Sequence, residues 1–182
     1  GEGAPLTPIF HKLINFNMNL KGVNIFLNIG GVSNVTLINR NKIITAFDTG
    51  PGMGLLDNFI YEKKKILFDK NGNFSAKGKV NKFVVKKLMK DPYFMRKPPK
   101  SLDKNKFNIK IFYKYNFYDS CATIVDFSTE CIKISLSNLK INIDNLIVMG
   151  GGTKNKFFMS SLSDKVNINI LNIRELGMNE DF

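Results

Sequence analysis

The sequence lacks an apolar run long enough to cross a membrane. Its longest apolar stretches, such as residues 143–149, contain polar side chains and fall far short of the ~18 residues that a spanning helix needs. No basic segment followed by an apolar one opens the chain, so no secretion signal is expected. These absences predict a protein of the cytoplasm without a membrane partner.

Cysteine is scarce, and its spacing excludes a disulfide. The two cysteines, Cys121 and Cys131, fall in one helical pattern, and their separation corresponds to about 15 Å of helical rise. A disulfide requires Cα atoms within about 7 Å of each other. We therefore expect two reduced thiols that pack inside a helix, as is usual in the cytoplasm.

Arginine is rare although the chain is strongly basic. Lysine and arginine total 27 against 15 acidic residues, for a net charge of +12, yet only three are arginine. Arginine recognises bases and phosphates better than lysine, and the lysines are scattered, with residues 63–65 the densest run. A nucleic-acid-binding module stays open as an alternative, but we favour compositional drift in a chain rich in Asn, Lys and Ile, with no nucleic-acid partner.

What is present fits one folded domain. The chain has 182 residues, 43% of them hydrophobic, and a chain of this size buries roughly two-thirds of its unfolded surface. No internal repeat or low-complexity linker divides it. Apolar periodicity and turn residues predict the following elements. Strands are expected at Val23–Ile29, 35–38, 43–47, Asn145–Met149 and 166–171, and helices around residues 9–14 and at 53–61, 79–90, 119–139 and 154–162.

The first three strands predict an antiparallel meander, and the whole order predicts an α/β domain with a mixed sheet. Asp119 or Ser120 is expected to cap the longest helix. The apolar faces are assigned as follows: Ile9, Phe10, Leu13 and Ile14 in the first helix, Leu55, Leu56, Phe59 and Ile60 in the second, and Val80, Phe83, Val84 and Leu88 in the third.

The first glycine motif lies between the first two strands. Gly30 and Gly31 are followed by Ser33 and Asn34. A glycine pair lets backbone N–H groups approach an anion closely, and the two polar side chains add donors. An ordinary β-hairpin with glycine at positive φ explains the pattern equally well.

The second motif ends the third strand and leads into a helix. It contains Asp48, Thr49, Gly50 and Gly52. Free N–H groups at a helix start favour a phosphate or sugar oxygen, and Asp48 could hold hydrated Mg²⁺ or a substrate hydroxyl. Capping of the turn is the alternative, but we favour binding because ligands of α/β sheets collect at strand ends.

The third motif is a run of three glycines between a strand and a helix. Gly150, Gly151 and Gly152, with Asn155 close behind, offer a flat backbone surface for a nucleotide. The pattern is neither a Walker A loop nor GxGxxG. A tight turn, which is the alternative, rarely needs three consecutive glycines.

The remaining residues with titratable side chains that could act in catalysis or binding form no motif. His11 has no cysteine or acidic residue near it in the sequence, so we interpret it as structural or surface. Asp119, Asp126 and Glu130 are expected on a solvated helix face or at its cap.

In chain order, these motifs resemble the anhydro-N-acetylmuramic acid kinase family. The meander with its glycine turn, followed later by helix, strand and glycine turn, is similar to the C-terminal lobe of the actin/hexokinase-like, ribonuclease H-like ATPase fold. The resemblance covers essentially the whole chain. It rests on Gly3-Ala4-Pro5-Leu6 with Pro8 and His11, residues 28–34, residues 47–52 with Asp57, Asp91-Pro92-Tyr93-Phe94, residues 98–103 with Phe107, and Gly150–Gly152 with Asn155.

The resemblance implies an ATP- and Mg²⁺-dependent sugar kinase. Members phosphorylate 1,6-anhydro-N-acetylmuramic acid while water opens the anhydro ring, giving N-acetylmuramic acid 6-phosphate for peptidoglycan recycling in the cytoplasm. The implied site residues are Gly30, Gly31, Ser33 and Asn34 at a phosphate turn, Gly150, Gly151, Gly152 and Asn155 at the adenosine surface, and Asp48, Thr49, Gly50 and Gly52 in the cleft, with Asp48 reaching the metal through water.

The resemblance also implies that much of the enzyme lies elsewhere. Residues 1–182 would be a single C-terminal lobe, without the N-terminal lobe, the aspartate general base expected before Gly1, or a final helix after Phe182. No catalytic residue is therefore assigned, and we expect the fragment to be inactive. Met53 stands where members commonly have Asn. Another sugar or acetate kinase of the same superfold is the alternative; the expected partners are ATP and an amino sugar, with homodimer formation left open.

Overall fold

The strands at Val23–Ile29, Val32–Asn39 and Asn145–Met149 are buried on both faces, because the five-stranded sheet lies between two layers of helix. The computed structural model describes residues 6–103 and 106–173. Short 3₁₀ turns connect several of its elements. The strands are β1 (Val23–Ile29), β2 (Val32–Asn39), β3 (Lys42–Pro51), β4 (Asn145–Met149) and β5 (Asn169–Asn172), and the helices are α1 (Leu6–Asn17), α2 (Gly54–Lys64), α3 (Lys82–Leu88), α4 (Phe117–Ser137) and α5 (Lys156–Lys165).

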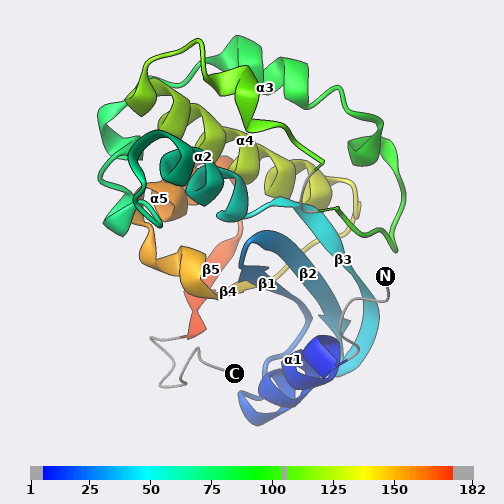
Figure 1. The fold of residues 1–182 in the computed structure, drawn as a ribbon. Coiled ribbons are helices and arrows are strands. Elements are labelled where there is room, and N and C mark those ends of the chain that lie inside the picture. The colour runs from blue at the N-terminus through cyan, green and yellow to red at the C-terminus, as the bar shows by residue number, and fades with distance from the viewer. Residues whose placement is uncertain (1–5, 104–105, 174–182) are drawn as a thin grey trace.

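The sheet has the order β3-β2-β1-β4-β5 (Figure 1). β1, β2 and β3 pair antiparallel as a meander, whereas β4 runs parallel to β1, and β5 parallel to β4. The predicted mixed sheet is confirmed. Because β1, β3 and β4 run in the same direction, their carboxyl ends, and the three glycine motifs that follow or end them, reach the same edge.

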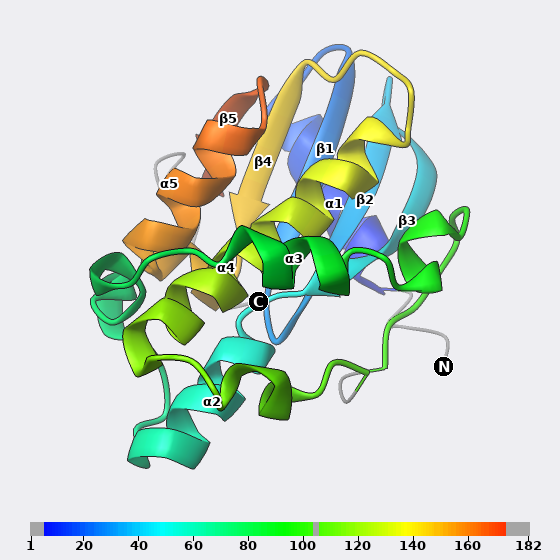
Figure 2. The same cartoon turned by 90° about the horizontal axis from the view of Figure 1, so that it is seen from above.

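The two faces of the sheet pack against different helices. Ile25 and Leu27 of β1 belong to the larger apolar cluster, which includes α2, α3, α4 and α5. Phe26, between them, points to the opposite face and packs with Ile14 of α1. This alternation is the period of two that a strand buried on both faces requires, and Figure 2 shows α1 behind the sheet and α4 in front of it.

The helix α4 forms the centre of the larger layer. It has 21 residues, most of them buried. Cys121 and Cys131 are both buried and unbonded to each other, so the predicted packing role of the two thiols is confirmed. In the part of the chain that the structure describes, no helix combines the length and apolarity required to cross a bilayer.

Several element boundaries differ from the prediction. β3 does not end at Phe47 but continues to Pro51, because Val32, Ser33 and Asn34 of β2 pair with Pro51, Gly50 and Asp48. The second strand is longer for the same reason. The predicted strand at 166–171 is the shorter β5, and the helix predicted at 154–162 begins and ends later as α5.

Three expectations about helix faces and caps are wrong. Phe83 is 75% exposed, whereas α3 buries the predicted Val84 together with Val85, which was not predicted. On α1, Ile9 and Leu13 are exposed while His11 and Ile14 face the sheet. The cap of α4 is Asn116, whose side chain accepts from the amides of residues 118 and 119, rather than Asp119 or Ser120.

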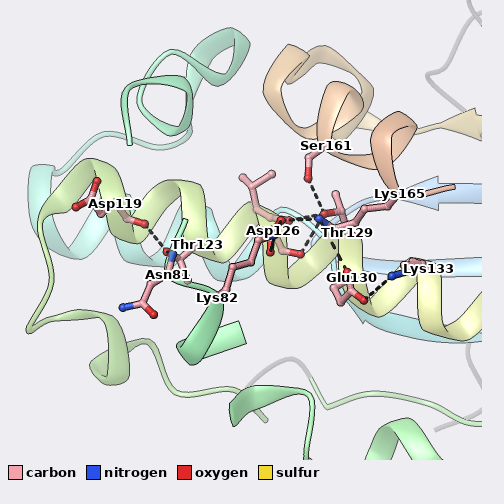
Figure 3. A network of polar contacts seen from close by, with 11 residues as sticks. Asn81, Lys82, Asp119, Thr123, Asp126, Thr129, Glu130, Lys133, Ser161 and Lys165 are labelled. Carbon is pink, nitrogen blue, oxygen red and sulfur yellow. Dashed lines mark hydrogen bonds and ion pairs between the residues drawn. The ribbon is translucent and has the colours of Figure 1, made fainter. Parts of the chain in front are cut away.

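Asp126 does not lie on a solvated face, contrary to the prediction. Its side chain is 6% exposed and is paired with Lys82 of α3 and Lys165 of α5, as Figure 3 shows. Glu130, one turn further along α4, pairs with Lys133 and lies 3.9 Å from Lys165. This carboxylate cluster therefore ties three helices together, and burial is possible because each charge has a partner.

Candidate functional site

The first two glycine motifs meet through three backbone hydrogen bonds. The amides of Gly52, Met53 and Gly54 donate to the carbonyls of Gly30 and Gly31 over 2.8–3.0 Å. The turn between β1 and β2 is therefore attached to the start of α2. The expectation that these particular amides are free for a phosphate is wrong, because the hairpin turn already occupies them.

The third motif packs against the end of β1. Gly150 has a φ of +89°, and a Cβ there would lie 2.4 Å from Asn28 Oδ1 and 2.8 Å from the carbonyl of Ile29. A Cβ on Gly152 would lie 2.2 Å from the Ile29 side chain. These two glycines are required by packing, and they bring the two glycine turns side by side.

Gly31 and Gly151 have no such structural requirement. Both are exposed, and a Cβ on either would meet no atom of the described residues within 4 Å. Neither has a positive φ of the kind that favours glycine. At these two positions the chain presents bare backbone to the outside, which is the arrangement that a close approach by a ligand needs.

Ser33 and Asn34 occupy different environments. The Ser33 hydroxyl is fully buried, lies against Gly52, and has no hydrogen-bond partner within the described residues. It cannot reach a ligand at the surface in this conformation. Asn34 is partly exposed and pairs with Asp48 across β2 and β3.

Asp48, Thr49 and Gly50 are bound into the surrounding structure. Asp48 Oδ2 accepts from the amide of Leu102 over 2.8 Å, and burial raises the pKa of this half-buried carboxyl. The Thr49 hydroxyl donates to the carbonyl of Ser33. A Cβ on Gly50 would lie 2.5 Å from that of Cys131, so this glycine lets β3 pack closely on α4.

Asn155 acts first as a helix cap. Its Oδ1 accepts from the amide of Phe158 at the start of α5. The residue is 3% exposed, and its Nδ2 has no partner among the described residues. All twelve predicted site residues lie around the carboxyl ends of β1, β3 and β4. Among their glycines, Gly31 and Gly151 are the two at which an added Cβ would meet no described atom within 4 Å.

The family model for anhydro-N-acetylmuramic acid kinase matches residues 1–182. The chain belongs to this family. Relatives named anhydro-N-acetylmuramic acid kinase include those of Methylorubrum populi, 36% identical over 100% of this chain and 48% of the relative, Haemophilus influenzae, 34% identical over 91% and 48%, and Pseudomonas syringae pv. tomato, 37% identical over 90% and 46%. The chain spans about half the length of these curated relatives.

Solved structures with the same fold support the predicted architecture of the chain. It is similar to the activator of the 2-hydroxyisocaproyl-CoA dehydratase from Clostridium difficile, with a TM-score of 0.54 at 14% identity over 87% of this chain and 56% of that one. Component A of the (R)-2-hydroxyglutaryl-CoA dehydratase of Acidaminococcus fermentans matches with a TM-score of 0.53 at 13% identity, over 87% and 57%. The predicted actin/hexokinase-like ATPase fold is confirmed.

Sequence patterns gave no role to one carboxyl at the start of α2, close to the glycine turns. Asp57 lies in the first turn of α2, and its Oδ1 is buried without a partner in the described part of the chain. Burial and the nearby charge of Asp69 raise the pKa of Asp57 to about 6. The sequence did contain one sign of this burial: Asp57 lies between Leu55, Leu56 and Phe59, which belong to the predicted apolar face of the helix.

A small hollow borders Gly31. Its volume is about 180 Å³, and its lining includes Pro51, Asn58, Leu102 and Phe107. Most of these side chains are apolar, so the hollow suits an uncharged part of a ligand better than a phosphate. Residues 3–5 of the first family motif lie outside the described residues.

Proposed function

We propose that the chain is the C-terminal lobe of a two-lobed kinase that transfers a phosphoryl group from ATP to 1,6-anhydro-N-acetylmuramic acid. Water opens the anhydro ring in the same reaction, so that the products are ADP and N-acetylmuramic acid 6-phosphate. Family membership supports this acceptor. The free, buried thiols of Cys121 and Cys131 fit a cytoplasmic enzyme of peptidoglycan recycling.

The observation that carries the proposal is the open pair Gly31 and Gly151. They lie on adjacent turns after the parallel strands β1 and β4, and no atom of residues 6–103 or 106–173 lies within 4 Å of a Cβ placed on either glycine. We assign Gly31, with its neighbours Gly30 and Asn34, to the phosphates and the Gly150–Gly152 turn to the adenosine. The similar dehydratase activator was solved with bound ADPNP, which supports a nucleotide as the ligand.

The chain's own contribution to metal binding is small. No group of three His, Cys, Asp or Glu side chains that could hold a metal ion occurs among residues 6–103 and 106–173. Mg²⁺ commonly keeps several waters and binds through one or two carboxylates plus substrate phosphates. The half-buried Asp48 fits this pattern as a contact through water, and when bound the metal would neutralise phosphate charge.

Replacing the two open glycines tests the nucleotide surface directly. Gly31→Ala and Gly151→Ala are each expected to leave the melting temperature unchanged, since the added Cβ meets open space. They should nevertheless weaken MgATP binding about tenfold, because the methyl group lies where the ligand approaches. The measurement is a ¹H–¹⁵N NMR titration of the labelled chain with MgATP, which detects weak binding.

A matched control is Gly150→Ala, which should destabilise the fold because of its positive φ and the clash with Asn28. If MgATP shifts no amide around Gly31 and Gly151, or if both alanine variants bind as the unchanged chain does, the assignment of the nucleotide surface is wrong.

The identity of the acceptor sugar and the requirement for both lobes need a separate assay. The 182-residue chain should form no N-acetylmuramic acid 6-phosphate from ATP and the anhydro sugar, because one lobe cannot hold donor, acceptor, metal and base together. A longer chain that supplies the relatives' other half should form it, and should prefer the anhydro sugar to ordinary hexoses. Product formation by the 182-residue chain would contradict the first expectation, and turnover of hexoses alone would favour a different sugar kinase.

A further inference from the structure

The far end of α2 carries an unusual run of exposed side chains. Residues 63–68, here called the basic–apolar tip, are three lysines followed by Ile66, Leu67 and Phe68, and all six are exposed. The exposed fractions of the three apolar residues are 44%, 70% and 55%. Consecutive large apolar side chains in water are unfavourable unless something covers them.

Hydrogen bonds fix the backbone within the tip and directly after it. Lys65 ends α2 in the left-handed conformation, with φ at 58°, and its amide donates to the carbonyl of Tyr61. Directly after the tip, Asp69 is 3% exposed and accepts from the amide of Phe74 and from both the amide and the hydroxyl of Ser75. Since the backbone at Lys65 and Asp69 is already ordered, docking through the tip costs little conformational entropy.

Tyrosine rings flank the tip and contact its lysines. Lys63 Nζ lies 3.8 Å from the ring centroid of Tyr113, and Lys65 Nζ lies 5.0 Å from that of Tyr61. Tyr61 and Tyr113 are themselves 48% and 38% exposed. Tyrosine combines an apolar body with a polar end, and it is favoured where a membrane meets water.

The charge around the tip selects the kind of partner. Residues 61–70 hold four exposed lysines, whereas their one exposed carboxylate is Glu62. A second copy would place lysines against lysines, so a negative surface is the better complement. A nucleic acid would satisfy the lysines but would leave Ile66 and Leu67 without an apolar partner. A bilayer with anionic headgroups satisfies both.

We propose that the basic–apolar tip docks the protein on an anionic lipid surface. Leu67 and Phe68 enter the headgroup region while the lysines contact lipid phosphates. Surface docking needs no spanning helix, so the shortness of the apolar runs does not oppose it. The tip is also separate from the glycine turns, because the 11 residues of α2 place it about 16 Å from Gly54.

Cosedimentation with vesicles tests the proposal. The 182-residue chain is expected to sediment with vesicles of phosphatidylcholine mixed with phosphatidylglycerol, and not with phosphatidylcholine alone. Leu67→Ser combined with Phe68→Ser should lower the affinity about tenfold or more through the lost apolar transfer, and Lys63→Gln with Lys64→Gln about tenfold through the lost charges. The matched control is Phe83→Ser, an equally polar change at a side chain that is 75% exposed on α3, and it should bind as the unchanged chain does.

Each other outcome overturns the proposal. Equal sedimentation with neutral and anionic vesicles would remove the role of charge. An unchanged affinity in the Leu67→Ser, Phe68→Ser variant, with its melting temperature intact, would remove the role of the tip. Binding to duplex DNA or RNA without vesicle binding would assign the surface to nucleic acid, and concentration-dependent self-association that the double serine variant abolishes, without vesicle binding, would assign it to a second copy.

Discussion

Asp126→Asn is expected to lower the free energy of unfolding by about 3 kcal/mol. The substitution leaves Lys165, whose side chain is 12% exposed, with Glu130 at 3.9 Å as its remaining ion-pair partner among the described residues. Removing one partner of a buried pair strands the other charge in a poorly solvated place. We take the lower end of the range for buried pairs because the second partner, Lys82, is 66% exposed. Urea unfolding followed by circular dichroism measures the change.

Two further variants separate the contribution of the exposed Lys82 to stability from that of the buried pair Asp126–Lys165. Lys82→Met should cost at most about 1 kcal/mol, since its pair with Asp126 is open to solvent on the lysine side. Asp126→Leu combined with Lys165→Met should recover much of the stability lost in Asp126→Asn, because the one charge left without its partner, Lys82, is exposed to water. A loss below about 1 kcal/mol in Asp126→Asn would mean that water reaches Lys165 and that the cluster does not hold the helices together.

His11 is expected to make stability fall as the pH drops below about 6.5. Its ring is fully buried, stacks on Phe26 with centroids 5.1 Å apart, and lies with Nδ1 2.9 Å from the Thr36 hydroxyl. Burial lowers its pKa to about 4. The unfolded chain therefore binds a proton that the folded chain excludes, so stability rises with pH across this interval, by about 3 kcal/mol in total.

Asp57 acts in the opposite direction over part of the same interval. Its pKa is raised to about 6 in the folded chain, so the folded state binds the extra proton and stability falls as the pH rises. The contribution of His11 is therefore measured as a difference, by comparing urea unfolding of the unchanged chain and His11→Asn between about pH 4 and pH 7. Identical pH profiles in the two would contradict a neutral buried imidazole, and Asp57→Asn provides the control for the opposing group.

Local patterns were sufficient for the order of elements, because apolar periodicity depends on neighbours a few residues apart. The pairing of distant residues was not accessible in this way. β3 continues through Asp48 because β2 lies beside it, and Asp126 is buried because its lysine partners come from 44 and 39 residues away. The site shows the same limit: the glycine motifs were found, but the attachment of Gly52–Gly54 to the hairpin turn depends on tertiary contact.

The open glycines have a consequence for how such a chain changes over generations. At Gly31 and Gly151 the exposed surface consists of main-chain atoms, which every sequence supplies alike. A chain can therefore accumulate Lys, Asn and Ile over most of its exterior, and reach a net charge of +12, without altering the atoms presented there. Replacement of the glycines themselves would change this surface, so the backbone that we propose for the nucleotide is well insulated from compositional drift.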